Sequence, residues 1–268
     1  MIDILKKQFS QDMNSEEKIN RLREFLQILC LKIIHDKGYF KNVAFVGGTA
    51  LRVLYDLRRF SEDLDFSVIK TEGYDFSEII KALEYELKLY GLNVESKNKI
   101  DKTVQSSFLK FNQLLKEFGL SQLEEQKLSV RIEVDSNPPK GWGTESTLIN
   151  KTYVFPILHF DLPSLYATKL HACFFRRFIK GRDFYDFIWY LGRKVKPNFI
   201  LLNNAIKQTD GKDLKLEDQN FKEFLLKKIE GVDFSSLKRD VERFMEDKTE
   251  LDLLNPKLIK KSITGQTF

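Results

Sequence analysis

The sequence predicts a protein of the α+β class, in which a small mixed sheet with its helices is followed by a helical bundle. Three observations support this prediction. Short apolar or alternating segments of strand length, such as 43–46 and 128–135, lie in the first part of the chain. Amphipathic helical patterns lie between them, and from Asp161 onward the pattern is helical throughout. We therefore expect an α/β domain over residues 1–160 and a helical domain over residues 161–268.

The start of the chain predicts, in order, a helix, a strand, a short helix, a strand and a second long helix. Their ranges are 15–36, 43–46, 49–57, 64–68 and 75–91. The long helices are assigned from apolar residues that recur every three or four positions, such as Leu22, Phe25 and Leu26. Gly47 and Gly48 are expected to form a turn after the first strand.

The middle of the chain is harder to assign. Residues 92–112 show no clear period, and we expect a mixture of strand and loop there. The segment LSVRIEVD (128–135) alternates between apolar and polar residues and predicts a strand. The proline- and glycine-rich segment 136–144 predicts a loop. The segment TYVFPILH (152–159) predicts a short strand, which Pro156 confines to the edge of the sheet or to a strand end.

The helical part begins at Asp161, a residue suited to capping a helix, just before Pro163. The predicted helices occupy LYATKLHACFFRRF (165–178), RDFYDFIWYLGRK (182–194), 199–206, 217–230 and 234–247. The tail from Asn255 onward is expected to be loosely held.

The composition is that of an ordinary globular protein, with 42% hydrophobic and 31% charged residues among 268. Its net charge of +5 is compatible with a polyanionic partner. Cys30 and Cys173 lie far apart and form no metal-binding spacing, which favours a reducing cytoplasm. The three histidines are not closely spaced, so no histidine-based zinc site is expected. We also expect no secretory signal and no membrane span, because no apolar run approaches roughly 18 residues.

One stretch, VGGTALRVLYDLRRFSEDLDFS at residues 46–67, carries candidate chemistry. Asp63 and Asp65 lie two positions apart on the predicted strand, so their side chains project to the same side. Two carboxylates held this close repel each other, and a divalent cation such as Mg²⁺, or alternatively Mn²⁺, relieves the repulsion. A third carboxylate on a neighbouring strand often completes a two-metal site, and Glu133 or Asp135 is a candidate for it. That polar strand face is otherwise simply exposed to solvent.

The glycine pair supplies a complementary feature. Gly47 and Gly48 allow backbone N–H groups to approach phosphate oxygens without obstruction by a Cβ atom. A helix that begins at Thr49 adds its positive end and a hydroxyl group. A glycine pair alone is usually only a turn, and an Asp-x-Asp segment alone is usually a solvated face. Their order, with an acidic strand downstream, favours one site for phosphate and metal.

The motif GGTALR…RRFSEDLDF resembles the first motif of the AbiEii/AbiGii nucleotidyltransferase toxins, a family that includes MenT-like proteins. A second signature of that family, a lysine-containing helix followed by an Arg-Asp…Asp segment, is present as KLHACFFRRFIKGRDFYD at residues 169–186. The two signatures occur in the family's order, over roughly residues 20–190. The resemblance implies the polymerase-β-like nucleotidyltransferase fold.

The resemblance also implies roles for individual residues. The triphosphate and its metal would be held by Gly47, Gly48, Thr49, Asp63 and Asp65. Lys169 would contact phosphate, Asp183 would be the further acid of the second signature, and Asp186 is its neighbour one turn on. The wider superfamily often has Gly-Ser where this chain has Gly48-Thr49. This difference leaves open whether the threonine side chain or only the backbone binds phosphate.

The residue types of the second signature agree with these roles. Lys169 and Arg176 are seven positions apart on a predicted helix and share one face, which suits an anionic substrate. An ordinary charged helix face is the alternative. The two aspartates could instead cap a helix and pair locally with Arg182. Arg58 and Arg59 precede the acidic pair and could reach phosphate or be solvated, and Arg59 is the favoured nucleotide-binding residue.

The predicted function is Mg²⁺-dependent transfer of a nucleotide from an NTP to an acceptor hydroxyl, with release of pyrophosphate. The resemblance implies that the acceptor is the 3′ end of tRNA, that the modification stops translation, and that a cognate antitoxin neutralises the protein. Two alternatives stay open. The acceptor could be a protein side chain or a small molecule, or the chain could bind nucleotide or RNA without turnover.

Overall fold

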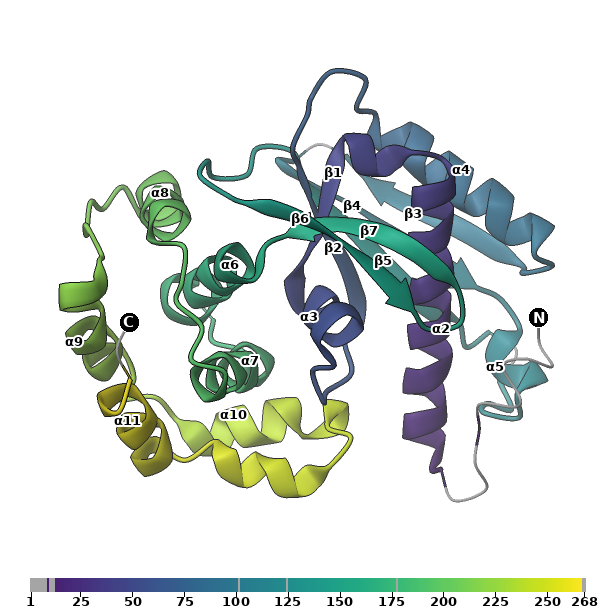
Figure 1. Ribbon diagram of the computed structural model, residues 1–268. Coiled ribbons are helices and arrows are strands. Elements are labelled where there is room, and N and C mark those ends of the chain that lie inside the picture. The colour runs from purple at the N-terminus through teal and green to yellow at the C-terminus, as the bar shows by residue number, and fades with distance from the viewer. Residues whose placement is uncertain (1–8, 10–12, 101, 124, 177, 267–268) are drawn as a thin grey trace. The chain divides into compact units, whose positions relative to one another are not determined.

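The computed structural model describes residues 9, 13–100, 102–123, 125–176 and 178–266 (Figure 1). These residues form two compact units. The first unit comprises the described residues up to Asp56, together with Phe60–Asn137 and Ser146–His159. The second comprises Leu57–Arg59, Pro138–Glu145 and the described residues from Phe160 onward. The short segment Leu57–Arg59 thus belongs to the second unit, although the residues on both sides of it belong to the first.

A mixed sheet of seven strands dominates the first unit. The strands are β1 (Val43–Val46), β2 (Asp63–Val68), β3 (Val94–Lys99), β4 (Val104–Phe111), β5 (Leu128–Asp135), β6 (Thr144–Asn150) and β7 (Val154–Phe160). Their order across the sheet is β3-β4-β5-β2-β1-β7-β6. β2 pairs with β5 and β1 pairs with β7 in parallel, whereas β1–β2, β3–β4 and β4–β5 are antiparallel. The predicted mixed sheet is confirmed.

The helices of the first unit cover this sheet. They are α2 (Ser15–Asp36), α3 (Gly47–Tyr55), α4 (Phe76–Leu89) and the short α5 (Leu114–Glu117), with a 3₁₀ turn at Tyr39–Lys41. α2 packs against α4 and β5, and α3 packs against β1 and β2 (Figure 1). Leu64 of β2 lies beside Ile132 of β5, and both side chains are completely buried. This apolar contact fixes the register of the two central strands.

Most of the predicted elements of this unit are present. The helices expected over 15–36 and 75–91, and the strands at 43–46 and 128–135, are confirmed with small shifts at their ends. Residues 92–112, which had no clear period, contain the whole of the antiparallel strands β3 and β4. The pattern was unclear because β3 is an edge strand whose side chains are mostly exposed.

Two predictions about this unit need correction. Gly47 and Gly48 do not form a separate turn before the helix, because α3 begins at Gly47, although Gly47 itself has a left-handed φ of +82°. The strand that contains Pro156 is not at the edge, since β7 lies between β1 and the unpredicted strand β6. Pro156 is the third residue of β7 and so lies toward the start of the strand, which is nearer to the second position that the sequence allowed. The register of β7 with β1 joins Phe45 to His159, three residues beyond Pro156. The proline therefore does not occupy that pairing position.

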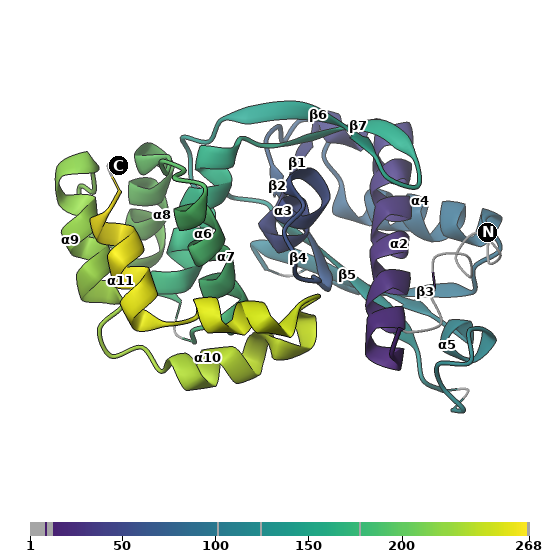
Figure 2. The same ribbon diagram turned by 60° about the horizontal axis from the view of Figure 1, so that its bottom comes forward.

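The second unit is built mainly from helices. They are α6 (Leu162–Phe175), α7 (Gly181–Gly192), α8 (Phe199–Asp210), α9 (Asp218–Lys228), α10 (Phe234–Val241) and α11 (Pro256–Thr264), with 3₁₀ turns at Glu242–Phe244 and Lys248–Leu253. α6 packs against α7 and α8, and α7 also contacts α10 and α11 (Figure 2). The rings of Tyr166 and Tyr190 stack between α6 and α7 with their centroids 4.2 Å apart. As predicted, Asp161 caps α6 by accepting the N–H of Ser164 at 2.9 Å.

The prediction of a loose tail is wrong. Residues Pro256–Thr264 form helix α11, with Asn255 as its cap and the side chains of Ile259 and Ile263 buried. The proline at the first helical position and the apolar pair four residues apart were the signals in the sequence. Among the described residues, no helix is long and apolar enough to cross a membrane.

Candidate active site

Strand β2 presents two carboxylates on one side of the sheet. Asp63 and Asp65 alternate with Leu64 and Phe66, and the apolar side chains are buried whereas the acids are partly exposed. Because successive side chains of a strand point to opposite faces, burial of the apolar pair determines where the acids point. Both carboxylates therefore project together.

The carboxylate of Asp65 rests against the first residue of α3. A Cβ atom added to Gly47 would lie 2.2 Å from Oδ2 of Asp65, far inside contact distance. Gly47 also has a φ of +82°, a conformation that residues with a Cβ rarely adopt. The N-cap residue Val46 makes no side-chain hydrogen bond to the helix. The amino end of α3, with its positive dipole end, thus lies beside a carboxylate.

The hydroxyl of Thr49 has a structural partner. Thr49 is completely buried, and its Oγ1 donates a hydrogen bond to the main-chain carbonyl of Asp63. This bond ties α3 to the start of β2. Of the two possibilities that the sequence left open, the geometry favours a phosphate contact through the backbone of Gly47 and Gly48 rather than through the threonine side chain.

Strand β5 places a further acid beside the pair. In the parallel register, Asp65 is opposite Glu133, so the two side chains share a face of the sheet. The carboxylate of Glu133 pairs with Arg131 at 2.7 Å. Asp135 lies at the end of the strand, where its Oδ1 accepts the N–H of Asn137 at 3.0 Å. Burial raises the pKa of Asp135. Glu133 is therefore the neighbour of the acidic pair, and Asp135 caps the turn that follows β5.

These acids fit a divalent cation only together with a substrate. Among the described residues, no group of three or more His, Cys, Asp and Glu side chains is arranged to hold a metal. Mg²⁺ usually binds proteins through one or two carboxylates and completes its shell with water and substrate phosphates. Asp63 and Asp65 supply that minimal set of hard oxygen ligands.

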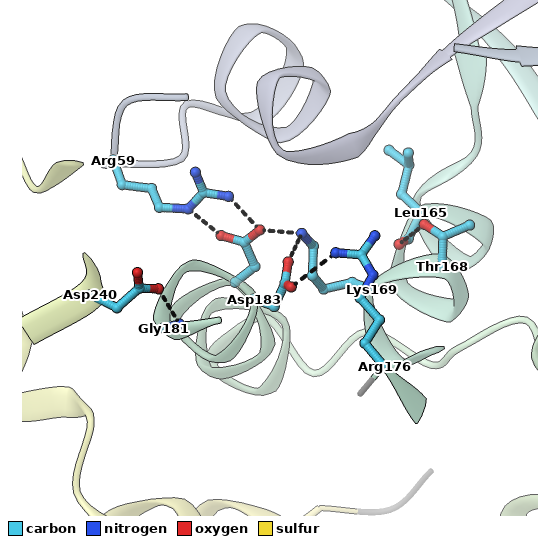
Figure 3. A network of polar contacts seen from close by, with 9 residues as sticks. Arg59, Leu165, Thr168, Lys169, Arg176, Gly181, Asp183 and Asp240 are labelled. Carbon is cyan, nitrogen blue, oxygen red and sulfur yellow. Dashed lines mark hydrogen bonds and ion pairs between the residues drawn. The ribbon is translucent and has the colours of Figure 1, made fainter. Parts of the chain in front are cut away.

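The second unit contains a separate group of charged side chains, which we call the buried charge cluster: Arg59, Lys169, Asp183 and Asp186, with Arg176 at its rim (Figure 3). Lys169 Nζ lies 2.7 Å from Oδ1 of Asp183 and 2.8 Å from Oδ2 of Asp186. Arg59 donates two hydrogen bonds of 2.6 Å to the two carboxylate oxygens of Asp186. Arg176, which is half exposed, lies 3.4 Å from Asp183.

The charges of the cluster stabilise one another. Burial raises the pKa of Asp183, but the positive charges of Lys169 and Arg176 outweigh it and lower that pKa to about 2. Burial lowers the pKa of Lys169, and the carboxylates of Asp183 and Asp186 outweigh this effect, so its pKa is raised. Asp183 and Lys169 are therefore both ionised at neutral pH, and each charge compensates for the burial of the other.

The local sequence explains how the cluster forms. Asp183 and Asp186 are three residues apart on α7 and share the face that meets α6, which carries Lys169. Gly181 begins α7 and donates its N–H to Asp240 at 2.7 Å, and a Cβ at Gly181 would lie 2.1 Å from the carbonyl oxygen of Leu237. The amino end of α7 is thus packed closely against α10.

The sequence did not indicate the partners within the cluster. The pairing of Arg59 with Asp186 joins residues 127 positions apart, and no local pattern encodes it. Asp186 pairs with Arg59 and not with Arg182, which was the local alternative. The guanidinium of Arg182 lies over the ring of Phe244 at 4.4 Å. Lys169 and Arg176 do converge, but on Asp183.

Comparison with known proteins adds the family. The family model described as "Nucleotidyl transferase AbiEii toxin, Type IV TA system" matches residues 30–256. The chain belongs to the AbiEii nucleotidyltransferase toxin family. It is therefore a nucleotidyltransferase, and the matched range contains both the acidic pair of β2 and the buried charge cluster. The family resemblance inferred from the two sequence signatures is confirmed.

Two solved structures from Helicobacter pylori align with this AbiEii-family chain over most of its length. One is JHP933, with 18% identity, a TM-score of 0.52, and coverage of 91% of this chain and 93% of that chain. The other is described as a candidate nucleotidyltransferase, with 18% identity, a TM-score of 0.49, and coverage of 96% and 98%. At this level of identity the likeness to JHP933 concerns the fold alone. No curated protein sequence matches the chain.

Proposed function

We propose that this AbiEii-family nucleotidyltransferase transfers a nucleotide from an NTP to the 3′ end of tRNA, releases pyrophosphate and thereby blocks translation. The observation that carries the proposal is the contact of the Asp65 carboxylate with Gly47 at the amino end of α3. A helix amino end binds phosphate, and a carboxylate beside it holds the cation that accompanies phosphate. In this reading, β1, α3 and β2 form the centre of a polymerase-β-like nucleotidyltransferase domain over residues 1–160.

The backbone of α3 and the acids of β2 would bind different parts of the substrate complex, namely the triphosphate and the metal ion. Gly47 and Gly48, at the amino end of the helix with Thr49, would hold the triphosphate through their N–H groups. Asp63 and Asp65 would hold Mg²⁺, or Mn²⁺ in its place. The cation, when bound, neutralises negative charge on the phosphates and on the acceptor oxygen. Enzymes of this family generally use an NTP and a divalent metal ion.

Proton transfer requires a base near the acceptor hydroxyl. One of the two acids of β2, or Glu133 opposite Asp65, would take the proton of the attacking hydroxyl. The helical part over 161–268 would contribute Lys169, whose positive charge would stabilise the triphosphate, and Asp183 as the further acid. Arg59, Arg176 and Asp186, also predicted to contact the nucleotide, belong to the same buried charge cluster.

The family and the net charge support the proposed acceptor and the proposed partner. A net charge of +5 favours the approach of a polyanion such as tRNA. Membership in a type IV toxin–antitoxin family implies a cognate antitoxin, which would neutralise the toxin. Cys30 and Cys173 are free and buried, which fits a reducing cytoplasm. The alternatives are a protein or small-molecule acceptor, and a member that binds nucleotide or RNA without turnover.

The direct test is the incorporation of each α-³²P-labelled NTP into total tRNA with Mg²⁺, with wild type compared with Asp65→Ala. Label that is present with wild type and lost in the variant supports the proposal and identifies the nucleotide. Bound NTP without labelled tRNA would redirect the search to other acceptors. A chain that binds no NTP would contradict the enzymatic proposal. The matched control is Asp36→Ala, which removes an exposed carboxylate at the end of α2.

A further inference from the structure

The arginine of the buried charge cluster has a role that the sequence did not suggest. We infer that Arg59 is a positioning residue, which fixes the ammonium group of Lys169 through the carboxylate of Asp186. Arg59 and Asp186 would then act on the reaction without touching the nucleotide. The inference rests on the proposed function in one respect, namely that Lys169 acts on the triphosphate.

Arg59 and Asp186 form a buried ion pair with two parallel hydrogen bonds. Nε and Nη2 of Arg59 each lie 2.6 Å from a different carboxylate oxygen of Asp186, which is the planar two-bond arrangement of guanidinium and carboxylate. The side chains are 2% and 0% exposed. A pair this buried and this short has one geometry, so Arg59 holds the orientation of the Asp186 carboxylate.

One carboxylate oxygen of Asp186 contacts both Arg59 and Lys169. Oδ2 of Asp186 accepts from Nη2 of Arg59 and also lies 2.8 Å from Nζ of Lys169. Lys169 is held from its other side by Asp183 at 2.7 Å. The ammonium group therefore sits between two carboxylates, one of which Arg59 fixes in place (Figure 3 labels Arg59, Lys169 and Asp183).

Arg59 also balances the charge of the cluster. Arg59, Lys169, Asp183 and Asp186 together carry two positive and two negative charges, so the core of the cluster is neutral. Without Arg59, Asp186 would share the ammonium group of Lys169 with Asp183, while the half-exposed Arg176 would pair with Asp183 from the rim. Asp186 would lack the guanidinium group that compensates for its burial, and the negative charge beside Lys169 would be less well balanced. Arg59 thus keeps the field around Lys169 suitable for an anionic substrate.

The position of Arg59 is itself held by residues near the end of the chain. Arg59 forms an antiparallel bridge with Met245, and the N–H of Glu246 donates to the carbonyl of Arg58 at 3.5 Å. The guanidinium of Arg58 pairs with Glu250 at 2.7 Å. All of these residues belong to the second unit. The segment Met245–Glu250 therefore acts as the support for the positioning arginine.

A kinetic cycle tests whether Arg59 acts through Asp186. We expect Arg59→Met and Asp186→Asn each to lower kcat about 100-fold, and the double variant to be no worse than the poorer single variant, because both remove the same arrangement. Losses that multiply to about 10,000-fold, or normal turnover in Arg59→Met, would overturn the inference. Arg239→Met, on the exposed face of α10, is the control and should turn over as wild type does.

A second measurement does not depend on activity. In the wild-type protein Lys169 is 9% exposed. Arg59→Lys keeps the positive charge but loses the two-bond geometry, so Lys169 should become more accessible to acylation by acetic anhydride. We expect mass spectrometry to record labelling of Lys169 about tenfold faster than in wild type. The exposed Lys81 should be labelled at the same rate in both. Unchanged labelling of Lys169 would overturn the inference. If wild-type protein transfers no nucleotide, the proposed function fails, whereas the labelling still decides whether Arg59 holds Lys169.

Discussion

The carboxylate of Asp65 lies so close to Gly47 that a Cβ atom at residue 47 would sit 2.2 Å from its Oδ2. Replacement by alanine therefore displaces the carboxylate, the backbone or both. For Gly47→Ala we expect turnover to fall about 100-fold or more, because the carboxylate proposed to bind the metal and the amino end of α3 lose their relative placement. Transfer of labelled nucleotide, measured under saturating NTP, checks this expectation.

The matched control for this substitution is Gly91→Ala. Gly91 has a φ of +81°, nearly that of Gly47, but no atom lies within 4 Å of its added Cβ. Both variants meet the same backbone strain of about 1 kcal/mol, and only Gly47→Ala meets the carboxylate. Equal losses of turnover in the two variants would show that backbone strain, and not the contact with Asp65, is responsible.

The two acids of β5 should differ in their importance. Glu133 is opposite Asp65 in the register, whereas Asp135 caps the following turn. We expect Glu133→Gln to lower kcat about 10- to 100-fold, since it removes a candidate base and the partner of Arg131. Asp135→Asn keeps an acceptor oxygen for Asn137 and should stay within about threefold of wild type. The reverse order, measured as kcat, would identify Asp135 as the third acid.

The pKa of Asp183 predicts a pH dependence of stability. Its pKa is lowered from 3.8 to about 2 by Lys169 and Arg176, against the opposing effect of burial. A carboxylate with a depressed pKa stabilises the folded state above its unfolded pKa, and this stabilisation is lost as the pH falls through the folded pKa. The stabilisation from Asp183 is therefore lost between about pH 4 and pH 2, and its size is about 2 kcal/mol of the free energy of unfolding.

Asp183→Asn isolates this contribution. At pH 6 the variant should be less stable than wild type by about 3–5 kcal/mol, because Lys169 loses one of its two carboxylates. The difference should narrow by about 2 kcal/mol between pH 5 and pH 2. Urea unfolding followed by tryptophan fluorescence is suited to this test, since Trp142 and Trp189 both belong to the second unit. A difference that does not change with pH would contradict the pairing.

Substitutions in helix α11 test whether this segment is packed against the rest of the second unit. Ile263 is completely buried, whereas Leu258 of the same helix is 48% exposed. Ile263→Ala should lower the free energy of unfolding by about 2–4 kcal/mol through the lost contacts and the cavity. Leu258→Ala should change it by less than about 1 kcal/mol. Urea unfolding of the two variants distinguishes a packed helix from a loose tail, for which both changes would be small.

Much of the first unit could be predicted because its signals are local. Apolar and polar residues alternate strictly in β5, and apolar residues recur at helical spacing in α2. The sequence of each segment therefore predicts which of its faces is buried. The acidic pair of β2 is equally local, since two positions on one strand always share a face. The edge strand β6 was missed because its side chains are mostly exposed and it has no apolar face.

Local sequence therefore determined most of the elements, the two signatures and the shared direction of Asp63 and Asp65. The reason is that apolar residues recur within each segment at the period of its helix or strand. The tertiary structure alone decided the register that sets Asp65 opposite Glu133, the approach of its carboxylate to Gly47, and the pairing of Arg59 with Asp186. These contacts join residues far apart in the chain. Buried charges select partners by distance and desolvation in the folded protein, and neither quantity exists in the sequence before the chain folds.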